Sequence, residues 1–238
     1  MLAPPLARTA KSRFFSFGLP LDKYLPRQGL SLESLHEIHA ETPEDLPAAF
    51  GFLVALTVSL SASGAVFIVS LAQSLTSAGR LYGHGLNALG LDPGCVTLVE
   101  ARTNRDAFWA IEETLRSGDA SVTLGLLAQN FDLKTSQRFS LAARETKRPL
   151  LLLRPPGSAA ASAAETRWRV AAAPALRDAT GGLLSTGWRV GLERCRNGSS
   201  GEWVLEWLHA SHRFRLAAAM ADPALPDGAG AIARHRSR

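Results

Sequence analysis

The 238-residue chain contains only four lysines, and none of them follows a glycine. They are Lys11, Lys23, Lys134 and Lys147, preceded by alanine, aspartate, leucine and threonine respectively. A phosphate-binding loop of the nucleoside-triphosphatase type needs glycines whose backbone N–H groups surround the phosphates, a lysine for the terminal phosphates and a hydroxyl for magnesium. Because the chain has no Gly-Lys pair, the sequence argues against ATP hydrolysis.

Cysteine is scarcer still, since Cys95 and Cys195 are the only two and lie far apart. A disulfide framework or a zinc cluster needs more cysteines at closer spacing, so the pair suits a reducing compartment. The first residues contain no long apolar segment ahead of the basic ones, which argues against a secretion signal. We expect a cytoplasmic protein.

Charged residues are absent between Leu46 and Gly79. A membrane-spanning helix needs about 20 mostly apolar residues, but Ser61, Ser63 and Gly64 interrupt this run before it restarts as a strand-like segment. Strands of a parallel sheet that is covered on both faces are also almost continuously apolar. We therefore favour a buried helix followed by a central strand over a membrane segment.

The net charge of +5 conceals an asymmetry along the chain. Residues 32–132 carry four basic and twelve acidic residues, a net −8, whereas residues 134–215 carry fourteen basic and six acidic residues, a net +8. The basic half is a candidate surface for nucleic acid or an acidic protein. It can equally reflect an arginine-rich composition, because the chain has 22 arginines for its four lysines.

Strand and helix patterns alternate through the first two thirds of the chain. We expect strands at 34–40, 65–71, 96–99, 121–127 and 150–153, separated by helices at 45–62, 80–89, 104–116 and 135–146. Such alternation is typical of right-handed crossovers around a mostly parallel sheet. The predicted fold class is therefore α/β, with helices on both faces of the sheet.

The pattern changes after residue 154. Residues 155–165 are rich in alanine and serine and are expected to form a mobile loop, and residues 166–217 alternate with period two and predict an antiparallel extension of the sheet. We divide the chain into an N-terminal arm (1–17), one domain (18–217) and a disordered basic tail (218–238).

Few residues are candidates for catalysis or metal binding. His36 and His39 are one residue too close for the helical His-Glu-x-x-His motif and would face opposite sides of a strand. His209 and His212 have no further ligand at suitable spacing, and no serine nucleophile motif or acid pair is present. The sequence predicts no metal site and no catalytic residue.

The strand at 34–40 and the charge-free helix after it resemble the start of a RecA-type nucleotide-binding core. The phosphate loop would lie at a segment that instead carries three carboxylates, which would repel a triphosphate: Ala40, Glu41, Thr42, Pro43, Glu44, Asp45, Leu46 and Pro47. The strand segments at 67–72 and 122–127 also lack the acids that magnesium would need. We expect a degenerate site that binds no cofactor.

Two sets of residues are candidates for partner binding. The first is the aromatic and basic end of the N-terminal arm, with Arg13, Phe14, Phe15 and Phe17. The second belongs to the tryptophan and arginine residues of the C-terminal strands, which could form a stacking and phosphate-binding face or could simply pack in a core: Trp203, Trp207, Arg213 and Arg215.

Six segments, in order, resemble the ImuA family of damage-inducible mutagenesis proteins, which are distant relatives of RecA and of the SulA division inhibitor. They are GLPLDK (18–23), LHEI (35–38), LNALGLDP (86–93), WAIEETLRSG (109–118), TRWRV (166–170) and GEWVLEW (201–207). The resemblance implies a RecA-like core and a non-hydrolysing adaptor made in the SOS response, associated with the nucleoid when induced.

The implied partners are a Y-family polymerase-like protein (ImuB-like), an error-prone DNA polymerase subunit and RecA, with indirect DNA contact and no membrane. The resemblance leaves two alternatives open. A SulA-like division inhibitor would be shorter and would not need the C-terminal strands, and a DNA-binding, recombinase-like protein would bind nucleotide.

Overall fold

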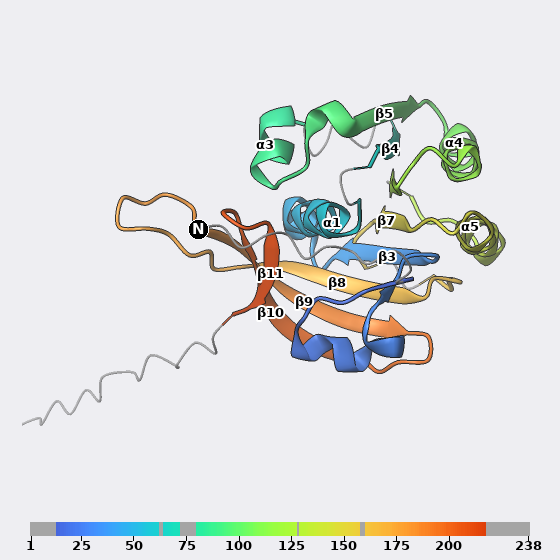
Figure 1. Cartoon of the computed structure of the whole chain (residues 1–238). Helices are drawn as coiled ribbons and strands as arrows, with labels where there is room; N and C mark the ends of the chain where they lie inside the picture. The colour runs from blue at the N-terminus through green and yellow to red at the C-terminus, as the bar shows by residue number, and fades with distance from the viewer. Residues whose placement is uncertain (1–12, 62–63, 72–79, 128, 158–159, 218–238) are drawn as a thin grey trace, which may run out of the picture.

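The structure, a computed structural model, describes residues 13–61, 64–71, 80–127, 129–157 and 160–217. A nine-stranded sheet crosses the molecule in the order β11-β10-β9-β8-β3-β7-β6-β4-β5 (Figure 1). Neighbours from β5 to β8 are parallel, and those from β8 to β11 are antiparallel. The strands are β3 (Leu35–Ala40), β4 (Val66–Leu71), β5 (Val96–Ala101), β6 (Val122–Leu126), β7 (Leu150–Arg154), β8 (Thr166–Ala173), β9 (Ser185–Cys195), β10 (Gly201–Leu208) and β11 (Arg213–Leu216). This confirms the predicted α/β class and its antiparallel extension.

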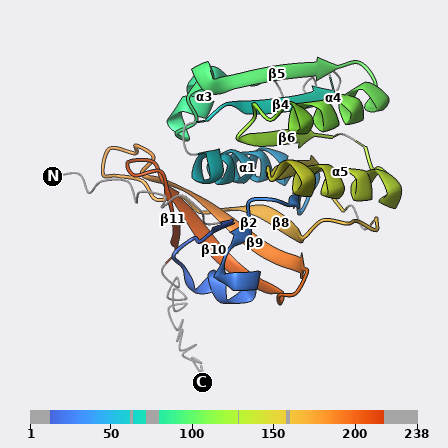
Figure 2. The same ribbon diagram turned by 45° about the vertical axis from the view of Figure 1, so that its right-hand side comes forward.

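Helices cover both faces of the sheet, as predicted (Figure 2). Helix α1 (Leu46–Ser61) lies across β8, β3, β7 and β6 and shares one hydrophobic core with α3 (Gly83–Ala88). Helices α4 (Asn104–Ser117) and α5 (Leu133–Thr146) form a second core on the opposite face. The predicted helix at 80–89 is shorter in the structure, where it covers Gly83–Ala88. Two glycines inside it disfavour a longer helix, and Gly90 after its end adopts a left-handed conformation.

The ends of α4 and α5 follow from their capping residues. Thr103 accepts a hydrogen bond from the Asp106 N–H at the start of α4, and Gly118 adopts a left-handed conformation at its end. Asp132 accepts from the Thr135 N–H at the start of α5. With this aspartate as its cap, α5 begins at Leu133, two residues before the predicted start.

The α1 core contains three of the largest buried side chains. Trp168, Trp188 and Trp207 project from β8, β9 and β10 toward the α1 side, and Phe52 of α1 lies between the first two. The helix packs on the same side, because a Cβ on Gly51 would be in ordinary van der Waals contact with the Trp188 ring, at 3.4 Å. The tryptophans of the C-terminal strands therefore pack in a core.

The segment Pro43–Ser61, which includes α1, is long and apolar enough to cross a membrane, and half of it is buried within the described structure. Its buried residues include Phe52, Leu53 and Leu56, all with no exposed surface. The helix is packed against four strands of the sheet. It is the buried helix that the sequence predicted.

The connection between β7 and β8 is held in place where it is described. Ser162 and Ala164 are buried, and the Ala163 N–H donates to the Ser136 hydroxyl of α5 at 2.9 Å. Residues 160–165 of the expected loop thus contact both α5 and β3. Residues 158–159 lie outside the described part.

The described end of the N-terminal arm packs on the sheet. Strand β1 (Phe14–Phe15) pairs with β2 (Leu30–Ser31), and the chain between them makes two 3₁₀ turns, Pro20–Tyr24 and Pro26–Gln28. Leu21, Leu25 and Leu30 enter the α1 core. The rest of the predicted arm (1–12) and the predicted tail (218–238) lie outside the described residues.

Candidate functional site at the β3–α1 junction

The position expected for a phosphate loop is a tight junction between β3 and α1. Strand β3 ends at Ala40, and a 3₁₀ turn (Pro43–Asp45) leads directly into the helix. The Thr42 hydroxyl donates to Asp45 Oδ2 at 2.9 Å and so closes the turn. The junction contains neither glycine nor lysine.

The backbone donors of this junction are largely absent or already used. Pro43 and Pro47 have no N–H. The Thr42 N–H donates to Asp45 Oδ2 (3.3 Å), the Asp45 N–H to the Thr42 carbonyl (3.1 Å), and the Leu46 N–H to the Pro43 carbonyl. A helix N-terminus binds phosphate through free N–H groups that point at the ligand. This one offers few of them.

Glu41 is held by two arginines of the neighbouring strands. Its carboxylate oxygens lie 2.7 Å from Arg169 of β8 and 2.6 Å from Arg189 of β9. The hydrogen bond from Arg189 lowers the pKa of Glu41 below its ordinary value. Arg169 also contacts Glu193 and Glu202. The face of β8 and β9 that points away from α1, called the open sheet face below, therefore carries a network of alternating charges.

Asp45 fastens the start of α1 to β8. Its Oδ1 accepts the Ala172 N–H at 2.9 Å, and this bond lowers the pKa of Asp45. Glu44, the third carboxylate of the junction, is exposed. Two of the three acids that the sequence analysis regarded as repelling a triphosphate thus also have a structural role.

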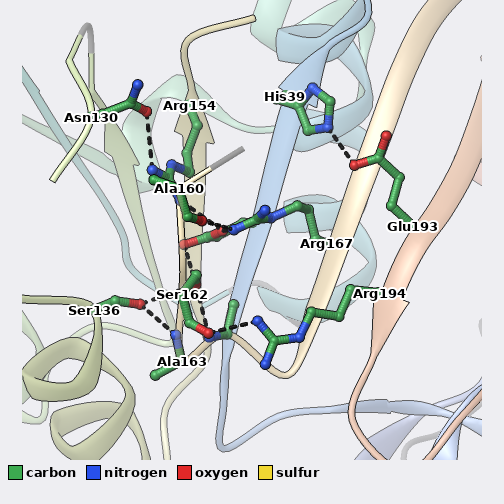
Figure 3. A network of polar contacts seen from close by, with 12 residues as sticks. His39, Asn130, Ser136, Arg154, Ala160, Ser162, Ala163, Arg167, Glu193 and Arg194 are labelled. Atoms are coloured by element: carbon green, nitrogen blue, oxygen red, sulfur yellow. Dashed lines mark hydrogen bonds and ion pairs between the residues drawn. The ribbon is translucent and has the colours of Figure 1, made fainter. Parts of the chain in front are cut away.

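A buried ionic network lies beside the junction and is centred on Glu37 of β3. Figure 3 shows its members Arg154, Arg167 and Ser162. Glu37 Oε2 accepts from Arg154 Nη1 at 3.0 Å and from Arg167 Nη2 at 3.0 Å, while Ser162 donates to Oε1 at 2.6 Å. The side chains of Glu37 and Arg154 are each only 1% exposed. A buried carboxylate needs such partners, since transfer out of water strongly disfavours its charge.

The surrounding residues fix the two arginines. Arg154 Nη2 donates to Asn130 Oδ1 at 3.0 Å, and its guanidinium lies 4.5 Å from the centre of the Phe131 ring. Arg167 donates to the Ala160 carbonyl at 2.8 Å. The connection between β7 and β8 is therefore tied to the sheet through the same network.

The network occupies the place where α/β sheets usually bind ligands. After β3 the chain crosses the α1 face of the sheet, whereas after β7 it crosses the α5 face, so the two adjacent strands mark a topological switch point. Ligands commonly bind outside the carboxyl ends of such strands. Here Arg154, at the carboxyl end of β7, forms ion pairs with the protein's own carboxylate.

Sequence reasoning did not identify Glu37 or Arg154. The signal was present, because Glu37 lies in the middle of a buried strand and Arg154 directly follows four leucines. Charged residues are almost never fully buried unless they are paired. A charge inside one predicted core strand and another directly after a second could therefore have suggested their contact.

His36 and His39 face opposite sides of β3, as predicted. His36 contacts the Thr166 hydroxyl (2.7 Å) and the Ser31 carbonyl (2.8 Å), whereas His39 contacts Glu193 at 2.9 Å. Among the residues the structure describes, no group of three His, Cys, Asp or Glu side chains could hold a metal ion.

We expect His36 to make the protein less stable as the pH falls below about 6.5. Burial lowers the pKa of His36 in the folded protein below its ordinary 6.5. The unfolded chain then binds more protons, so the free energy of unfolding falls by at most about 1.4 kcal/mol per pH unit. Urea unfolding at pH 7.0 and 5.5 should show a smaller pH dependence for His36→Asn than for the unmodified protein. The exposed-site variant His84→Asn should retain it, and equal dependence in His36→Asn and the unmodified protein would contradict the assignment.

The predicted partner-binding residues are dispersed in the structure. Phe17 is half-buried, with its ring centre 5.4 Å from that of Phe214 and 5.0 Å from that of Phe15. Trp207 is fully buried and donates to the Leu89 carbonyl, so it belongs to the core and cannot form a surface contact in this fold.

The other candidates lie nearer the surface. Trp203 packs against Tyr24, with ring centres 4.9 Å apart. Arg215 pairs with Glu206, and Arg213 is exposed. Arg13 is largely exposed and Phe14 is half-buried at the outer side of β1.

The tryptophans and arginines of β8 and β9 do not share a face. Trp168 and Trp188 face α1, while Arg169 and Arg189 face the opposite side and pair with carboxylates. Period-two alternation separates the two kinds of side chain. The stacking and phosphate-binding face considered for this region is not formed, and the core interpretation of these tryptophans is confirmed.

No protein-family model matches the chain, but known proteins are similar to it. The chain is similar to Protein ImuA of Caulobacter vibrioides, in strain NA1000 / CB15N and in strain ATCC 19089 / CIP 103742 / CB 15. In each comparison 32% of residues are identical over 226 residues, which cover 87% of this chain and 90% of the relative.

Proposed function

The chain belongs to the ImuA family, and from this premise we propose that it is a non-catalytic adaptor. Family membership supports a role in damage-inducible mutagenesis. In the proposed role the protein holds a Y-family polymerase-like partner, together with an error-prone polymerase subunit, without hydrolysing ATP. The same role would include contact with RecA. The protein would then lie in the cytoplasm and associate with the nucleoid.

The proposal rests on the backbone N–H groups of the β3–α1 junction, which are mostly missing or already hydrogen-bonded within the protein. Two of its residues are prolines, and three of its N–H groups are bonded within the turn. Its Glu41 and Asp45 are held in place by β8 and β9. Nucleotide binding would require this turn to open and the acids to leave their partners. A RecA-like core that serves as a scaffold agrees with these contacts.

Paired arginines argue against direct DNA binding by the open sheet face. Arg169 and Arg189 both contact Glu41 and Glu202. Phosphate binding depends on cations that are free to release counterions, and these cations are already neutralised by carboxylates. This favours protein partners.

The adaptor role predicts no nucleotide chemistry and a stable protein complex. Calorimetric titration with Mg²⁺ and ATP should give no binding heat, and phosphate release should stay at background with or without single-stranded DNA. Co-expression with the tagged polymerase-like partner should give co-purification at defined stoichiometry. DNA-dependent ATP hydrolysis, or no complex with the partner, would refute the proposal.

A shortened chain makes a useful comparison in the same co-purification. Deletion of residues 1–12 leaves Phe15 and Phe17 in their contacts with the α1 core. Deletion of residues 1–17 would remove those contacts and confuse loss of folding with loss of binding. The shorter deletion therefore tests whether the first part of the arm contributes to the complex.

A further inference from the structure

A pocket of about 310 Å³ lies at the end of the sheet opposite the β3–α1 junction. Its wall includes Arg144 from the last turn of α5, Glu165 just before β8 and Arg196 just after β9. Residues in and around β1 and β2, among them Arg13 and Arg27, contribute most of the remainder. Four arginines thus line one pocket.

The positive charge of the pocket is only partly compensated. Glu33 pairs with Arg13 at 3.4 Å, and Glu165 accepts a hydrogen bond from Ser34. Within the described part of the chain, neither Arg144 nor Arg196 lies within ion-pair distance of a carboxylate. Two exposed guanidinium groups therefore remain available at its edge.

Arg27 is held at the pocket by an unusual backbone. Arg27 and Gln28 both adopt left-handed conformations, with φ of 54° and 56°, and hydrogen bonds to the Leu25 and Pro26 carbonyls close the turn. Residues other than glycine seldom adopt this conformation, and strain of this kind is found preferentially at ligand sites. The turn places the Arg27 guanidinium 5.3 Å from the centre of the Phe14 ring.

We propose that this pocket binds an acidic peptide segment of a protein partner, with Arg144 and Arg196 pairing to its carboxylates. Guanidinium groups bind carboxylates through two parallel hydrogen bonds, which gives both affinity and orientation. Pro26 supplies apolar contact area for the same segment. The identity of the partner, the polymerase-like protein, rests on the proposed adaptor function.

The observations favour a peptide over a nucleic acid. Single strands are bound along extended basic grooves whose aromatic rings are open for stacking. Here the site is a compact pocket, and its Phe14 ring is covered by Arg27. A peptide can donate its backbone N–H groups to Glu33 and Glu165, whereas the phosphates of a nucleic acid carry no N–H donor for them.

Charge reversal tests the proposal, with Arg144→Glu/Arg196→Glu as the pocket variant. The matched control is Arg102→Glu/Arg105→Glu, at two exposed arginines on the far side of the sheet beside β5 and α4. Three probes are used with each protein: a fluorescein-labelled hexaglutamate peptide, a labelled dT20 oligonucleotide, and the co-expressed polymerase-like partner. Circular dichroism establishes that the variants fold, and Arg144→Gln/Arg196→Gln replaces the reversal if they do not.

We expect the pocket variant to bind the peptide at least about tenfold more weakly than the control does, and to lose the partner on purification. Failure of the unmodified protein to bind the peptide, or equal peptide affinity in the two variants, overturns the proposal. So does a pocket variant that loses only dT20 binding, which would make the site a nucleic-acid contact. If the peptide result holds but the unmodified protein never co-purifies with the partner, the adaptor function fails while the pocket assignment stands.

Discussion

Glu37→Gln is expected to lower the free energy of unfolding by about 3–5 kcal/mol. The substitution keeps the shape of the side chain but removes the charge that faces Arg154 and Arg167. The Arg154 guanidinium is almost completely buried and cannot move into water without breaking its contact with Asn130. Urea unfolding followed by circular dichroism measures the effect.

Glu44→Gln is the matched control, because Glu44 is an exposed carboxylate close by in the sequence. Its effect should stay within about 0.5 kcal/mol. A second variant tests the cause: Glu37→Leu/Arg154→Met replaces both charges by apolar groups and should cost clearly less than the sum of the two single substitutions. Additive effects would show that the ion pair is not the origin of the loss.

Trp188→Ala is the second substitution with a large expected effect, a loss of about 3–5 kcal/mol. Trp188 is 1% exposed, and its ring centre lies 5.7 Å from that of Phe52 in an edge-on contact. Gly51 of α1 faces the same ring, so truncation would leave a cavity between α1 and β9. Urea unfolding followed by circular dichroism should show this loss as a lower free energy of unfolding.

Trp109→Ala gives the same chemical change at a surface position. Trp109 lies on α4 and is 65% exposed, so little apolar surface is lost from the core. Its effect should be under about 1 kcal/mol. Comparable losses from the two tryptophans would mean that α1 does not pack on β9 as described.

Much of the architecture could be predicted from the sequence because its signals are local. The alternation of strand and helix segments, Gly118 at the end of α4 and the period-two pattern of the last strands each depend on neighbouring residues. The buried character of α1 followed from its lack of charge and from its interruption at Ser61. These features led to the correct fold class.

The site was less predictable because its contacts join distant segments. Glu37 meets Arg167 at a separation of 130 positions, and nothing in either segment indicates the other. The same limit applies to the carboxylates of the junction: Glu41 and Asp45 read as repulsive groups until Arg189 and the Ala172 N–H are known to lie beside them. The hydrogen bonds of residues 160–165 with α5 and β3 were not predictable either, because alanine and serine give no sign of such partners.

The position of β3 in the sheet sets the order in which the chain can fold. His36 pairs with Leu151 and Thr166, the latter 130 positions further along the chain. At about 5–20 residues per second, synthesis of that interval takes roughly 7–26 s. During this time α1 and β3 are outside the ribosome without the strands that cover them, and such non-local pairing also folds slowly. A chain truncated near residue 154 would leave this apolar surface permanently exposed. Soluble expression should therefore depend on the C-terminal strands as well as on the α/β core.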